Sequence, residues 1–100
     1  MIERYILNTH GEPVPEPDLR AWGAWMQNAA DRILARDEIG GVRVSTVFLG
    51  LDHSLGNGPP LLWETMIFGG SHNDYQERYE TRDEALAGHR QAVWLVTNPP

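Results

Sequence analysis

The chain has no cysteine and no lysine among its 100 residues, and it has no long apolar run. Without cysteine there can be no disulfide, thiolate metal site or thiol nucleophile, so the fold must rest on packing alone. No window approaches eighteen consecutive apolar residues, and the sequence therefore predicts no transmembrane helix. Residues 1–13 lack a basic start followed by an apolar run, so we expect no signal peptide. These absences predict a soluble, cytoplasmic protein.

The charge of the chain is carried by eight Arg against fourteen acidic residues, which gives a formal net charge of −6. This balance argues against non-specific binding to nucleic acid or to an anionic membrane, because both need a basic surface. It is compatible with binding to a basic protein surface. The hydrophobic content of 41%, with four Trp, three Tyr and two Phe, predicts a single globular domain over residues 1–100 with one core.

The first half of the chain predicts a strand, an extended connector and a helix. Residues 3–7 (ERYIL) form a short apolar run, and three prolines at alternate positions, 13, 15 and 17, then favour an extended chain. Residues 18–30 carry apolar side chains at helical spacing, and Gly23 in their middle indicates a close backbone approach. Residues 31–38 fit either a continued helix or a strand, and the Gly40-Gly41 hairpin signal favours the strand.

The second half predicts three strands and a helix. Residues 42–51 are rich in β-branched side chains, residues 61–68 are apolar on both faces, and residues 75–80 alternate as a charged edge strand. Thr81 and Glu84 form a capping box that opens a helix running to about residue 96. The element order β-α-β-β-β-β-α predicts a two-layer α+β fold, an antiparallel sheet of four to five strands with two helices on one face.

The candidate site residues gather in and around residues 43–70. The loop at residues 52–60 (DHSLGNGPP) is longer than two antiparallel strands require, which singles out Asp52, His53 and Asn57 as candidate binding residues. Glu64 lies within an apolar strand, and His72 follows the next turn. Carboxylates and imidazoles converging from neighbouring strand ends could hold a divalent metal.

The metal hypothesis takes Asp52, His53, Glu64 and His89 as candidate ligands, with no other cofactor expected. Their spacing matches no established signature, since the chain has no H-E-x-x-H and no H-x-H motif. The alternative is that turn-forming Asp and ordinary polar loop side chains account for all of them. Asp52-His53-Ser54 has the letters of a hydrolase triad, but adjacent residues cannot align as such a triad, and we assign no catalytic residue.

Glu64 and His89 are predicted inside apolar patterns, where each needs a partner. A carboxylate on the same face as Met66 must be paired, hydrogen-bonded or shifted in pKa, and an Arg on a neighbouring strand, such as Arg43, is the expected partner of Glu64. His89 follows Gly88, which would let the last helix approach the sheet. We expect His89 to bond a backbone carbonyl or a carboxylate such as Glu64, in a structural role.

The segments RVSTVFLGLDHSLGNGPPLLWETMIFGG and RYETRDEALAGH resemble a family of small uncharacterised proteins encoded by bacterial phages and prophages. The resemblance covers residues 44–70 and 78–89, with a weaker likeness near LNTHGEPVPEPDLRAW. It implies a phage-encoded protein in the cytoplasm of the host cell. It implies no catalytic or binding residue.

Three functions are compatible with the sequence. The first is a non-enzymatic protein that binds, and inhibits, a host or defence protein; its partner comes from the host or the phage. The second is a small metal-binding protein or metal-dependent enzyme that uses the loop His and carboxylates. The third is a minor virion or assembly component. The oligomeric state stays open, although the charges of residues 75–80 argue against a dimer through that edge.

Overall fold

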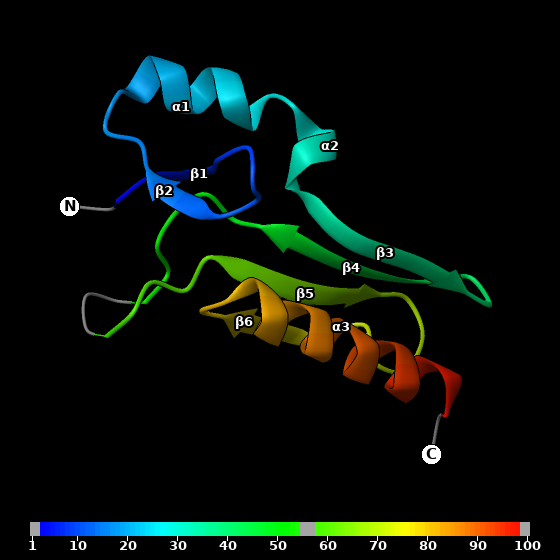
Figure 1. The fold of residues 1–100 in the computed structure, drawn as a ribbon. Coiled ribbons are helices and arrows are strands. Elements are labelled where there is room, and N and C mark those ends of the chain that lie inside the picture. Colours follow the sequence, from blue (N-terminus) through cyan, green and yellow to red (C-terminus); the bar gives the residue numbers. More distant parts are fainter. Residues whose placement is uncertain (1–2, 55–57, 99–100) are drawn as a thin grey trace.

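The computed structural model describes residues 3–54 and 58–98, and they form an α+β fold with two antiparallel sheets. A small sheet pairs β1 (Tyr5–Leu7) with β2 (Pro13–Pro15). The main sheet has the order β3-β4-β5-β6, in which every neighbouring pair is antiparallel (Figure 1). Its strands are β3 (Ile33–Ile39), β4 (Val42–Phe48), β5 (Trp63–Phe68) and β6 (Gln76–Tyr79). The predicted α+β fold with a four-stranded antiparallel sheet is confirmed.

The helices α1 (Leu19–Met26), α2 (Ala29–Arg32) and α3 (Arg82–Thr97) are distributed unevenly over this framework. Helix α3 lies along the main sheet and contacts all four strands, whereas α1 contacts β1 (Figure 1). The sequence placed both long helices on one face of the sheet. The structure differs because β1 and β2 pair with each other. Helix α1 follows them and packs at the end of the sheet, with the Trp25 ring edge-on to Phe48 at 5.6 Å.

Residues 31–38, whose sequence fits either a helix or a strand, contain the end of a short helix followed by a strand. The single turn of α2 ends at Arg32, and β3 begins at the next residue. Gly40 and Gly41 have φ of +54° and +83°, a conformation that glycine adopts without steric cost and that closes the β3–β4 hairpin. The preferred strand is therefore confirmed for residues 33–39.

Two helical glycines differ in their surroundings. A Cβ on Gly88 of α3 would overlap the hydroxyl end of Tyr79 on β6, so this glycine lets α3 lie close to the sheet, as predicted. A Cβ on Gly23 of α1 would meet no atom within 4 Å. The close backbone approach expected at Gly23 is therefore wrong. The predicted capping box at Thr81 and Glu84 is present, with both reciprocal hydrogen bonds formed.

The core under α3 consists of two apolar clusters separated by polar residues. One cluster contains Tyr5, Phe48, Leu62, Trp63 and Ala85, and the other contains Val44, Ile67 and Ala92. Between them, the fully buried Thr46 and Thr65 face His89 of α3. No helix within the described ranges is long and apolar enough to cross a membrane.

Candidate functional site

The first candidate residues, in the β4–β5 loop, close the base of that loop. The carboxylate oxygen Oδ1 of Asp52 accepts the N–H of Ser54 at 2.8 Å and the N–H of Leu61 at 3.1 Å. Burial acts to raise the pKa of Asp52, but these hydrogen bonds outweigh it and leave the pKa below its usual value. The backbone N–H of His53 bonds the carbonyl of Leu61 at 3.2 Å. Asn57 lies outside the described residues.

Glu64 lies on the face of the sheet opposite α3 and is paired there. Its Oε2 accepts Arg78 Nε at 2.9 Å and Gln76 Nε2 at 2.6 Å, both from the neighbouring strand β6. The predicted partner Arg43 is wrong, because the strand register places Arg43 opposite Phe68 and Arg78 opposite Glu64. Arg43 instead pairs with Glu38 of β3 at 3.3 Å. The expected pairing of Glu64 with an arginine is thus present, with a different arginine.

The predicted convergence of metal ligands is not found. His72 lies in the β5–β6 turn, where it lines a cavity of about 200 Å³ with Val42 and Val96. Asp52 and His53 lie in the β4–β5 loop at the opposite end of the sheet, and Glu64 and His89 are on opposite faces of it. Within residues 3–54 and 58–98, no three His, Asp or Glu side chains form a group that could hold a metal ion.

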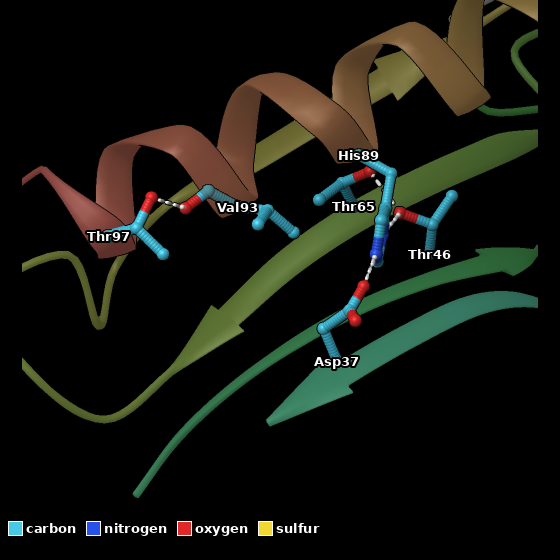
Figure 2. A network of polar contacts seen from close by, with 6 residues as sticks. All are labelled: Asp37, Thr46, Thr65, His89, Val93 and Thr97. Carbon is cyan, nitrogen blue, oxygen red and sulfur yellow. Dashed lines mark hydrogen bonds and ion pairs between the residues drawn. The ribbon is translucent and has the colours of Figure 1, made fainter. Parts of the chain in front are cut away.

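His89 is the centre of a polar network that reaches across the sheet from α3 (Figure 2). Its Nε2 is 2.7 Å from Asp37 Oδ2 on β3, and its Nδ1 is 2.7 Å from Thr46 Oγ1 on β4. The Thr46 hydroxyl in turn bonds Thr65 on β5. The expected bond of His89 to a carboxylate is present, but the carboxylate is Asp37 and not Glu64, which faces away from α3.

The network satisfies every hydrogen-bonding group within it. A carboxylate oxygen accepts, so His89 Nε2–H donates to Asp37, and the second ring nitrogen, Nδ1, shares a hydrogen bond with the Thr46 hydroxyl. Acid, imidazole and hydroxyl thus follow one another as in a hydrolytic triad. The hydroxyls of Thr46 and Thr65 are 0% exposed, however, and no substrate can meet them. We conclude that this network ties α3 to the edge strand β3.

Sequence reasoning missed Asp37, although a signal for it was present. In the strand interpretation of residues 31–38, Asp37 shares a face with Ile33 and Ala35. An acidic residue on the apolar face of a strand needs a partner, and a lone histidine on the apolar face of a helix is the natural candidate. The sequence separation of 52 residues concealed the pairing.

The face of the main sheet opposite α3 forms a second surface, which we call the open-face patch. It contains Arg36, Glu38, Arg43, Met66, Phe68, Gln76 and Arg78, which the strand registers place on one side. Exposure rises along β5 from Glu64, at 8%, through the half-buried Met66 to Phe68, at 44%. The patch holds three arginines and, with Glu64, two carboxylates, in a chain whose net charge is −6.

Comparison with known proteins adds no further residue to this site. No protein-family model matches the chain, and no curated protein and no solved structure matches it. The function is therefore inferred from the geometry of the described residues.

Proposed function

We propose that the protein acts by binding another protein through the open-face patch. The observation that carries this proposal is Phe68, a large aromatic side chain 44% exposed on a sheet face whose opposite side is covered by α3. Aromatic residues and arginines are the side chains that most often dominate binding energy at protein interfaces. Phe68 has Arg43 directly across from it on β4.

The charges of the patch define the surface that it fits. Arg36, Arg43 and Arg78 outnumber Glu38 and Glu64, although acidic residues dominate the chain as a whole. The exposed ion pair between Arg43 and Glu38 has side chains 47% and 62% exposed, so it contributes little to stability and can exchange partners. A partner with an apolar side chain for Phe68 and a carboxylate for Arg43 would complement the patch.

The biological setting of this proposal comes from the sequence resemblance. A small phage-encoded protein in the host cytoplasm would bind a host or defence protein and inhibit it. The acidic net charge keeps such a protein soluble and disfavours non-specific attachment to nucleic acid.

The test is affinity capture from a lysate of the bacterium that carries the gene, followed by mass-spectrometric identification. Phe68→Ser and Arg43→Ala should each abolish capture of a specific partner while leaving the melting temperature nearly unchanged. The matched control is Trp94→Ser on α3, which removes a side chain 56% exposed on the other side of the molecule. A specific partner that stably folded Phe68→Ser still captures would overturn the proposal, as would a partner that is lost with Trp94→Ser.

A further inference from the structure

Two adjoining cavities lie where the N-terminal elements meet the main sheet, and we call them together the Trp63 groove. The larger, about 680 Å³, is lined by residues that include Leu7, Asn8 and Trp25, and the smaller, about 220 Å³, extends to Leu34, Trp63 and Arg82. They share Leu7, Gly11 and Asp31. The larger volume falls within the range of roughly 300–1,000 Å³ that is typical of small-molecule sites.

The walls of the groove are apolar, and one of them carries an unpartnered donor. Leu7, Trp25 and Leu34 contribute apolar surface, and Ile33 beside them is 39% exposed. Trp63, 1% exposed, lines the smaller cavity, and its buried indole Nε1–H has no hydrogen-bond partner. A buried N–H without an acceptor costs roughly 1–3 kcal/mol.

Two arginines give the smaller cavity a positive rim. Arg82 is the first residue of α3, and Arg32 ends α2, where its Nε donates to the carbonyl of Phe48 at 3.3 Å. The opposing charge is Asp31, whose Oδ2 accepts the Asn28 side-chain amide at 2.8 Å. Two cations against one hydrogen-bonded carboxylate leave a net positive charge, which favours an anionic ligand.

We propose that the Trp63 groove binds a small organic anion in which an apolar body carries one carboxylate. The apolar body packs between Leu7 and Trp25, and the carboxylate meets the Arg82 guanidinium at the rim of the smaller cavity. This site is separate from the open-face patch, since Trp63 and Phe68 lie on opposite faces of β5. Binding in the groove therefore stands or fails independently of the protein partner.

The test is a titration with 2-naphthoate, followed by NMR of protein labelled with ¹⁵N in its tryptophan indoles. The Nε1–H signals of Trp25 and Trp63 should move and saturate. The signals of Trp22, whose Nε1 already donates to Gly50, and of the exposed Trp94 should stay in place. The variants Trp22→Phe, Trp25→Phe and Trp94→Phe assign the four signals.

Neutral 2-naphthamide and two arginine variants complete the experiment. Arg82→Gln should weaken 2-naphthoate binding at least tenfold, and the amide should bind the wild type at least tenfold more weakly than the acid. Arg90→Gln, on the exposed surface of α3 away from the groove, should leave the affinity unchanged. The proposal fails if the Trp63 signal does not move, if the amide binds as tightly as the acid, or if folded Arg82→Gln binds like the wild type.

Discussion

Each face of the main sheet holds a carboxylate–base pair with one buried partner, and the two faces differ in which partner is buried. Under α3, the base is buried, with the His89 side chain 6% exposed, and its carboxylate Asp37 is 53% exposed. On the open face, the carboxylate is buried, with Glu64 10% exposed at its side chain, and its base Arg78 is 39% exposed.

Because of this reversal, the pair under α3 is structural, whereas the pair on the open face has a base that is accessible to a partner. On the covered face, the buried His89 also bonds Thr46, so its position is fixed by two strands and a helix. On the open face, the buried Glu64 fixes one end of Arg78 and leaves the rest of that side chain available to a partner. We infer that the covered face specifies the fold and that the open face carries the interaction.

The largest effect is expected where α3 approaches the sheet most closely. Gly88→Ala should destabilise the protein by roughly 1–3 kcal/mol or more, because the added methyl group overlaps Tyr79. Gly23→Ala is the matched control in a helix with open space around it, and it should stabilise the protein by up to about 1 kcal/mol. Urea unfolding measures both. Equal effects of the two substitutions would show that α3 does not depend on this approach.

The next largest effect on stability compares the two faces of the sheet at adjacent residues of β4. Thr46→Val should lower the free energy of unfolding by roughly 1–3 kcal/mol, because it leaves His89 Nδ1 without its hydrogen bond and also removes the bond to Thr65. Ser45→Val, on the open face, should change the free energy of unfolding by no more than about 0.5 kcal/mol. Chemical denaturation gives both values. A larger loss for Ser45→Val than for Thr46→Val would reverse the assignment of the two faces.

Alkaline pH should loosen the covered face. Burial raises the pKa of Tyr79, which packs beneath α3, above its usual value of 10.0. A raised pKa means that the folded protein holds the proton more tightly than the unfolded chain. Stability from Tyr79 is therefore fully present below pH 10 and is lost as the pH rises through the folded pKa. Tyr79→Phe should make the decline in stability above pH 10 shallower, as thermal melts across this range can show.

A smaller effect on stability is expected in the β4–β5 loop. His53→Ala should leave the free energy of unfolding nearly unchanged, because the hydrogen bond that His53 makes to Leu61 uses its backbone N–H. Asp52→Ala should lower the free energy of unfolding by more than His53→Ala does, since Asp52 accepts hydrogen bonds from two backbone N–H groups at the base of the loop. If His53→Ala lowers the free energy of unfolding by more than ~2 kcal/mol, His53 is a structural residue.

The sequence predicts the strands and their faces well because alternation and β-branched content act locally. It places Glu64 on the correct face but names Arg43 as its partner, because the choice between Arg43 and Arg78 depends on strand register. Gly23 and Gly88 look alike in their helices, and only the tertiary packing shows that one of them is crowded. The open-face patch combines residues of four strands, so no local pattern reveals it.

The most direct test of the account combines binding and stability for two exposed aromatic side chains, Phe68 on the open face and Trp94 on α3. Phe68→Ser and Trp94→Ser would be melted and used side by side in the same affinity capture. We expect both variants to fold with nearly wild-type stability and only Phe68→Ser to lose the partner. Capture of the same partner by a stably folded Phe68→Ser would contradict it.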